Sequence, residues 1–221
     1  MAATVIDSII FQGIFSSDAM RQVWSDENRT QKYLDIERAL AIVQGRLGLI
    51  PQAAADEIVS HCRLDQIDML QLRAQTERIG YPILGVVSQL NALCKDKLGE
   101  YCHWGATTQD ITDTATVLQI REALALVDDE LAGISAALAT LARDHRLTPM
   151  IGRSNLQQAI PVTFGYKMAG LLSATASAWR NCARACWWAN LPGRPARWLR
   201  CRPARWKRKP ACAPSWAWAS R

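Results

Sequence analysis

One short segment, residues 102–115, carries most of the side chains in this sequence that could do chemistry: CHWGATTQDITDTA. His103 precedes the flexible Gly105, and two adjacent hydroxyls, Thr107 and Thr108, follow. Acidic residues then stand in the first turns of an expected helix, for which Thr108 is the candidate N-cap. The N–H groups at a helix start are unpaired and carry partial positive charge, which suits a small carboxylate. The expected ligand is therefore an anion.

Two alternatives stay open from the residue types alone. The run Thr-Gln-Asp before apolar residues is also typical of an ordinary capped helix that binds no ligand. A second polar cluster follows between two apolar helices, and it is equally typical of a solvated turn. This cluster consists of Arg153, Ser154, Asn155, Gln157 and Gln158.

Several segments resemble one known family. The string HWGATTQDITDTA is similar to the first signature of the fumarase/aspartase superfamily, in the branch of adenylosuccinate lyase and 3-carboxy-cis,cis-muconate cycloisomerase. WSDENR and GLIP resemble the N-terminal domain of that branch. GRSNLQQAIPVTFGYK resembles the second signature, with Ser154 in place of a threonine and Asn155 in place of a histidine. RIGYPILGVVSQL lacks the histidine that adenylosuccinate lyases usually carry there, which favours the cycloisomerase group.

The resemblance implies an enzyme that removes a proton beside a carboxylate and stabilises the resulting enediolate. Removing one preformed donor from such an oxygen typically costs ~2.7–4 kcal/mol of transition-state stabilisation. No metal and no cofactor are implied. The implied catalytic residues are His103, Thr108, Ser154 and Asn155. The implied substrate-binding residues are Thr107, Thr108, Gln109, Arg153, Gln157 and Lys167.

The same resemblance implies a homotetramer whose active sites combine three signatures from three subunits. The general base of the superfamily is a serine in the third signature, a Gly-Ser-Ser segment, and no such segment occurs in these 221 residues. We therefore expect this chain to be a truncated enzyme without appreciable activity. The leading interpretation is a cycloisomerase-like enzyme, or a related lyase, that acts on a small polycarboxylate. Adenylosuccinate lyase is the alternative.

The last part of the chain, residues 181–221, differs abruptly in composition. It holds ten of the 26 Lys and Arg residues, six of the nine Trp and none of the 20 acidic residues. Residues supplied by GC-rich codons dominate it, and we interpret it as a shifted reading frame that begins near Arg180. The other possibility is a non-catalytic helical module whose basic tail binds nucleic acid through phosphate neutralisation and base stacking.

The elements that must position the site are helices, so the predicted fold class is all-α. We expect an N-terminal helical domain over residues 1–108, the start of a central helical-bundle domain over 109–180, and an aberrant tail over 181–221. Apolar spacing and capping residues predict helices that end near Trp24 and run over 25–48, 51–62, 65–79, 82–98, 109–146 and 161–180. The helix over 109–146 is apolar on so much of its surface that a bundle or a subunit interface should bury it.

Composition also indicates in which cellular compartment the protein resides. The N-terminus lacks a basic leader region, and no apolar run reaches the ~18 residues of a membrane span, which favours a cytoplasmic protein. The seven cysteines show no CxxC motif and no metal-ligand spacing, which favours reduced thiols.

Overall fold

A computed structural model of the chain describes residues 4–6 and 8–189, with side chains as far as Trp179. Helices dominate these residues, and the predicted all-α class is confirmed apart from one two-stranded sheet. The chain divides into two compact units, the first ending at Arg121 and the second beginning at Glu122. Each unit is described by itself.

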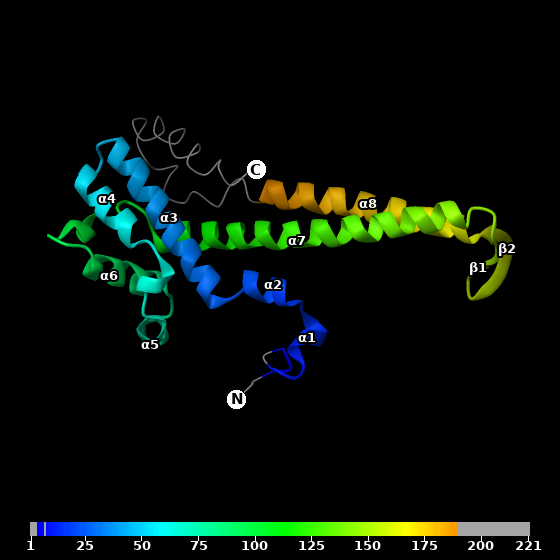
Figure 1. Cartoon of the computed structure of the whole chain (residues 1–221), viewed down its shortest axis with the longest axis horizontal. Coiled ribbons are helices and arrows are strands. Elements are labelled where there is room, and N and C mark those ends of the chain that lie inside the picture. The colour runs from blue at the N-terminus through cyan, green and yellow to red at the C-terminus, as the bar shows by residue number, and fades with distance from the viewer. Residues whose placement is uncertain (1–3, 7, 190–221) are drawn as a thin grey trace. The chain divides into compact units, whose positions relative to one another are not determined.

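The first unit contains six helices and the start of a seventh (Figure 1). Short 3-10 turns at Leu64–Gln66 and Leu98–Tyr101 join some of them. The helices are α1 (Gln12–Phe15), α2 (Asp18–Val23), α3 (Asp26–Arg46), α4 (Gln52–His61), α5 (Met69–Ile79), α6 (Ile83–Leu93) and the first part of α7 (Thr108–Asp144).

Capping side chains set the starts of α2 and α3, as the sequence predicts. The Ser17 hydroxyl accepts from the Met20 N–H, and the Ser25 hydroxyl accepts from the Asn28 N–H. Each bond satisfies an N–H that the helix leaves unpaired. After α3, Gly48 has φ +62°, a conformation that favours glycine and ends the helix near the predicted point.

Two helix boundaries differ from the prediction. The helix expected from Asp65 begins only at Met69, because the Asp68 carboxylate accepts the N–H groups of residues 70 and 71 and caps the helix there. The helix expected to reach residue 98 ends at Leu93. Asp96 and Lys97 adopt φ of 51° and 58°, so the backbone leaves the helical conformation before that point.

The core of the first unit is built mainly by α3, α4 and α6. Leu34, Ile58 and Leu90 are completely buried. A Cβ at Gly45 would lie 2.7 Å from the Ala55 Cβ, so the close approach of α3 and α4 requires glycine there. On α3, Tyr33, Ile36 and Val43 are buried, whereas Leu47, just after the helix, is 36% exposed.

The start of α7 joins this core directly. Ile111 and Ala115 are buried in it, and so is the polar Gln119. The Gln119 amide donates to the Val23 carbonyl at 2.8 Å and accepts from Arg29 Nε at 3.1 Å. Both of its functions are therefore satisfied, and α7 is fixed to the α2–α3 connection.

The second unit contains the rest of α7, strands β1 (Pro149–Ser154) and β2 (Gln157–Thr163), and helix α8 (Phe164–Ala189). The strands form an antiparallel hairpin, and α8 then returns along the second part of α7 (Figure 1). The Trp179 indole N–H donates to the Asp128 carboxylate, and the rings of His145 and Phe164 meet edge to face at 5.2 Å.

The hairpin and its flanks correct the sequence prediction. Polar residues 153–158 form strand ends and a tight turn, not a loop between two helices. The helix expected from Pro161 begins at Phe164 because β2 continues to Thr163, and its backbone runs past Arg180 to Ala189.

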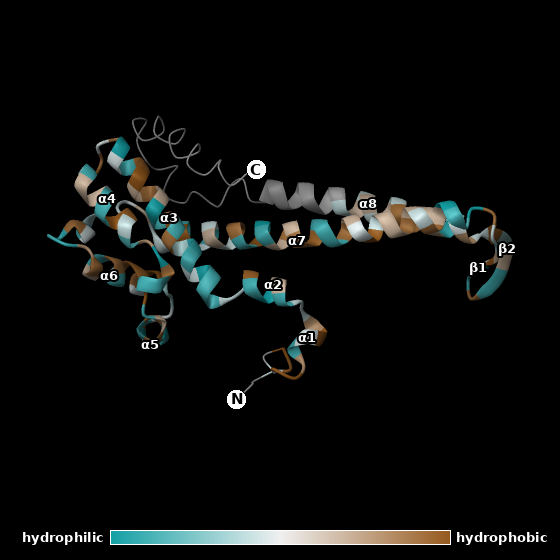
Figure 2. Cartoon of the chain, viewed as in Figure 1, coloured by the Kyte–Doolittle hydropathy of each residue, from teal (hydrophilic) through white to brown (hydrophobic). Residues whose placement is uncertain are grey.

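Within this single chain, only the beginning of α7 is fully buried. Apolar residues recur along the helix (Figure 2). Its fully buried residues within the described part of the chain are Ile111, Ala115 and Gln119, whereas Ile134 and Leu141 are 48% and 37% exposed. Across the described residues, every helix is too short or too polar to span a membrane. The reading-frame and nucleic-acid hypotheses concern side chains that lie outside the described residues.

Candidate active site

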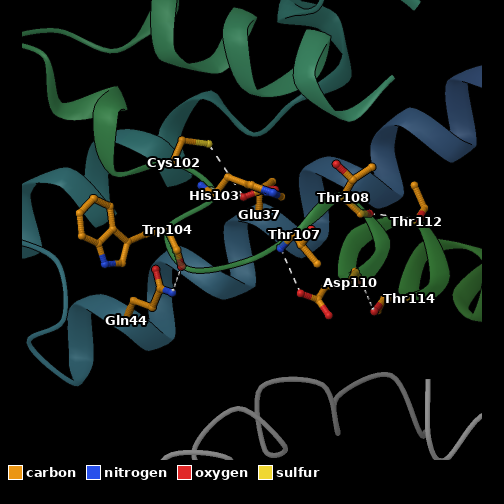
Figure 3. A network of polar contacts seen from close by, with 10 residues as sticks. All are labelled: Glu37, Gln44, Cys102, His103, Trp104, Thr107, Thr108, Asp110, Thr112 and Thr114. Carbon is orange, nitrogen blue, oxygen red and sulfur yellow. Dashed lines mark hydrogen bonds and ion pairs between the residues drawn. The ribbon is translucent and has the colours of Figure 1, made fainter. Parts of the chain in front are cut away.

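Helix α3 holds the loop that carries His103. Glu37 is 2% exposed as a residue. Its carboxylate accepts from the backbone N–H of His103 at 3.1 Å, and the ring Nδ1 of His103 lies 2.6 Å from the same carboxylate (Figure 3). The Cys102 thiol approaches the same carboxylate at 3.9 Å. A carboxylate buried this deeply needs such donors to offset its lost hydration.

A second side chain of α3 holds the loop one residue further on. Gln44, two helical turns after Glu37, donates from Nε2 to the Trp104 carbonyl at 2.7 Å (Figure 3). The two contacts keep His103 at φ 58° and lead into Gly105 at φ +70°. A left-handed conformation costs a non-glycine residue on the order of 1–3 kcal/mol, and the α3 contacts offset that cost.

The start of α7 corrects one detail of the sequence prediction. The helix begins at Thr108, so Thr107 occupies the capping position that was predicted for Thr108. The Asp110 carboxylate accepts the Thr107 N–H at 3.0 Å, which satisfies this amide from three residues ahead. The cap is thus provided by a carboxylate and not by either of the paired threonine hydroxyls.

The threonines near the start of α7 fall into two groups. The hydroxyls of Thr112, Thr114 and Thr116 donate to carbonyls four residues back, at 3.1, 2.6 and 2.8 Å. The hydroxyls of Thr107 and Thr108 make no hydrogen bond within the described part of the chain, although both residues are half-buried. These two hydroxyls remain available to a ligand.

The electrostatics beside this helix start favour an anion. Burial lowers the pKa of His103, but the hydrogen bond and charge of Glu37 and the charge of Asp110 outweigh it, so the pKa is raised above 6.5. The imidazolium form therefore persists to higher pH than in a free histidine. Its charge adds to the partial positive charge of the helix N-terminus.

The remaining predicted site residues are Gln109, which follows the paired threonines directly, and a group that lies farther along the chain. Gln109 is exposed and donates to the Asp113 carboxylate. Lys167 is exposed on α8. The others lie on the exposed tip of the hairpin in the second unit: Arg153, Ser154, Asn155 and Gln157. Ser154 pairs with Gln157 across the turn. It stays a prediction that these hairpin residues and the residues around His103 act together in one active site.

The cysteines near the site are held as thiols. Cys62, Cys94 and Cys102 are free. Burial raises the pKa of Cys62 to about 12 and that of Cys94 to about 11, and burial also raises the pKa of Cys102. Protonated thiols are weak nucleophiles and poor metal ligands. Within the described residues, His, Cys, Asp and Glu form no group of three suited to a metal ion.

The sequence prediction did not identify three residues that position this loop and the start of α7, namely Glu37, Gln44 and Asp110. Asp110 stands three residues after Thr107, which is the spacing of a capping box and could have identified it. Glu37 lies four residues after the buried Tyr33, so it is a charged residue on the apolar face of its helix. That position could have marked it as buried and paired.

Comparison with known proteins places these features in context. A family model described as "Lyase" matches residues 13–185. Trans-aconitate decarboxylase 1 of Mycosarcoma maydis is 61% identical over 160 residues, which cover 72% of this chain and 32% of that protein. Relatives of lower similarity include an adenylosuccinate lyase of Methanocaldococcus jannaschii, at 35% identity over 70% of this chain and 34% of that protein.

Two solved enzyme structures also resemble this chain. A fumarate lyase from Mesorhizobium sp. BNC1 is 49% identical with a TM-score of 0.73, covering 77% of this chain and 40% of that one. The 3-carboxy-cis,cis-muconate lactonizing enzyme of Pseudomonas putida is 34% identical with a TM-score of 0.75, covering 80% and 41%. The chain thus spans well under half the length of the proteins it matches.

Proposed function

Since the chain belongs to the lyase family of the fumarase/aspartase superfamily, we propose that it is part of an enzyme acting on a small polycarboxylate through an enediolate. The observation that carries this proposal is the pair of hydroxyls on Thr107 and Thr108. They stand at a helix start beside a histidine whose pKa is raised, and the protein does not use them for capping.

These groups suit the chemistry of an enediolate. Its formation moves negative charge onto a carboxylate, and donors already in place there lower the barrier. In this proposal Thr107 and Thr108 hold that carboxylate, and His103 contributes positive charge. Arg153, Ser154, Asn155, Gln157 and Lys167 bind further parts of the substrate within a homotetramer. Asn155 cannot act as a general acid, because an amide does not titrate near neutral pH.

We rank trans-aconitate first among candidate substrates. The relative named for its decarboxylation is 61% identical, against 34% for the muconate lactonizing enzyme and 35% for the adenylosuccinate lyase. Decarboxylation breaks a C–C bond, releases CO2 and spreads the electron pair through the double bond onto a carboxylate. A proton taken up at carbon completes the reaction. The charged intermediate is again an enediolate, so in this proposal the same clamp, formed by Thr107, Thr108 and His103, stabilises it.

Nuclear magnetic resonance of the purified, isotope-labelled chain tests this proposal. Added trans-aconitate is expected to shift the backbone amide signals of Thr107 and Thr108 and the ring signals of His103, with saturation. Parallel titrations with 3-carboxy-cis,cis-muconate and adenylosuccinate compare the affinity for each of these alternative substrates with the affinity for trans-aconitate. If none of the three moves these signals, the proposed site is wrong. If only nucleic acid binds, with an affinity that falls steeply with salt, the non-catalytic alternative replaces it.

A further inference from the structure

Glu37 stands out among the buried groups of the first unit. It lies 66 residues before His103 in the chain, in the middle of α3, and its side chain is 1% exposed. Three donors from two consecutive residues converge on it: the Cys102 thiol, the His103 backbone N–H and the His103 ring Nδ1 (Figure 3).

We propose that Glu37 is a positioning residue that fixes which nitrogen of His103 carries a proton and thereby presents Nε2 to the anionic substrate. This inference rests on the proposed function, because it concerns the same site. The first step is the tautomer. An ionised carboxylate has only acceptor atoms, so Nδ1 at 2.6 Å must carry a proton. All proton exchange of His103 therefore takes place at Nε2.

The second step is the freedom of Nε2. No residue in the described part of the chain hydrogen-bonds this nitrogen, whereas Nδ1 and the backbone N–H are both held. Gln44 holds the next residue from the same helix. The ring is thus oriented from one side, and its other nitrogen is left for a ligand, an arrangement typical of functional histidines.

The third step is charge. The charged groups that act on His103 are Glu37 on α3 and Asp110 on α7, whereas burial raises the pKa of the neighbouring Cys102 thiol and keeps it neutral. Both carboxylates favour the imidazolium, in which Nε2 becomes a donor. A donor with positive charge forms a charge-assisted hydrogen bond to a substrate carboxylate, roughly twice as strong as a neutral bond.

The substitution Glu37→Gln separates this role from simple packing, because it keeps the side-chain shape and removes the charge. Nitrogen-15 spectra of the histidine rings are recorded against pH in the full chain, with the His103 signals assigned by their loss in His103→Gln. In the unchanged protein we expect the Nδ1-protonated tautomer at high pH. In Glu37→Gln we expect a lower His103 pKa, a mixture of tautomers and on the order of tenfold weaker trans-aconitate binding.

A matched control is present in the same chain. Glu57 Oε1 on α4 lies 3.3 Å from Nε2 of His61, so Glu57→Gln makes the same chemical change at another histidine. It should leave the His103 titration and trans-aconitate binding unchanged. Glu37→Asp retains the charge and should keep the His103 pKa above that of Glu37→Gln.

The outcomes distinguish this inference from the proposed function. An Nε2-protonated tautomer in the unchanged protein overturns the inference even if Glu37→Gln does not fold. So does an unaltered His103 titration in folded Glu37→Gln, or a lowered pKa with trans-aconitate affinity unchanged. Failure of the unchanged protein to bind any polycarboxylate, with the tautomer as expected, instead overturns the proposed function.

Discussion

The threonines at the start of α7 illustrate how position decides what a hydroxyl can do. Within a helix, Thr112, Thr114 and Thr116 find a carbonyl four residues back and bond to it. Thr107 and Thr108 stand where no such carbonyl precedes them, and Asp110 takes over the cap. The same residue type is therefore structural in one turn and free for a ligand in the turn before it.

The first prediction follows from that contrast. Thr108→Val removes one free hydroxyl and keeps the β-branched shape, so it should weaken trans-aconitate binding with little effect on thermal stability. The expected loss is about 1.5–3 kcal/mol, or roughly 10- to 100-fold, as for a hydrogen bond to a charged group. Isothermal titration calorimetry measures it. Thr112→Val, which removes a hydroxyl bonded to its own helix, is the control and should leave affinity unchanged.

The Glu37–His103 pair predicts a pH dependence of stability. The pKa of His103 is raised above 6.5 in the folded protein, so the folded state binds more protons than the unfolded state just above that pH. The stabilisation is complete below pH 6.5 and is lost as the pH rises through the folded pKa. Urea unfolding across this range should show a decline in the free energy of unfolding that is smaller in His103→Gln. An equal decline in both proteins would contradict the assignment.

The sequence indicated the candidate site residues 103, 107 and 108 but not the residues that hold this segment in place. His103 and the paired threonines were identified because they lie in one segment of distinctive composition. Glu37 and Gln44 are distant in the chain and belong to a helix that otherwise serves as packing. Their role depends on a tertiary contact with residues 102–104, and no local pattern encodes such a contact.

At the scale of elements, the sequence predicted an element well where capping or turn residues mark its ends. Helix α3 was predicted closely because Ser25 caps it and Gly48 ends it in the left-handed conformation. The hairpin was missed because its strands are short and its turn is Asn155-Leu156. Two-residue turns with positive φ at both positions usually contain glycine, and leucine gives no such signal.

That turn provides an element-scale prediction. Leu156 has φ 65° and is fully exposed, so its side chain is strained without gaining any burial. Leu156→Gly should stabilise the hairpin by about 1 kcal/mol. Slower amide hydrogen exchange in β1 and β2 would show this effect. Leu156→Ala keeps the strain while removing the apolar group, so exchange that slows equally in Leu156→Ala would contradict the explanation.

At the scale of the whole molecule, the exposed apolar side chains of the second unit predict self-association. Where exposed apolar side chains gather, they mark interaction sites in soluble proteins. The exposed residues include Ile134, Leu147, Ile160, Tyr166 and Leu171. The resemblance to a homotetrameric superfamily agrees with this expectation.

Analytical ultracentrifugation tests the prediction. Ile134→Glu should shift the purified chain toward a smaller species, because it places a charge on the apolar surface of α7. Thr140→Glu adds the same charge at an exposed polar position of that helix and should leave the distribution unchanged. A monomer in the unsubstituted protein would contradict the proposed interface.

The last prediction concerns turnover. In the proposed function Thr107, Thr108 and His103 bind and polarise a carboxylate, but the catalytic cycle also needs a group that moves a proton at carbon. By resemblance the superfamily places that group on a Gly-Ser-Ser segment, and the 221 residues contain none. We therefore expect the purified chain to bind trans-aconitate while releasing no CO2 above the uncatalysed rate, measured by coupled carbonate detection. The opposite outcome would be steady CO2 release that the substitution Thr108→Val abolishes. It would show that a residue within this chain moves the proton, and His103 would be the first residue to substitute.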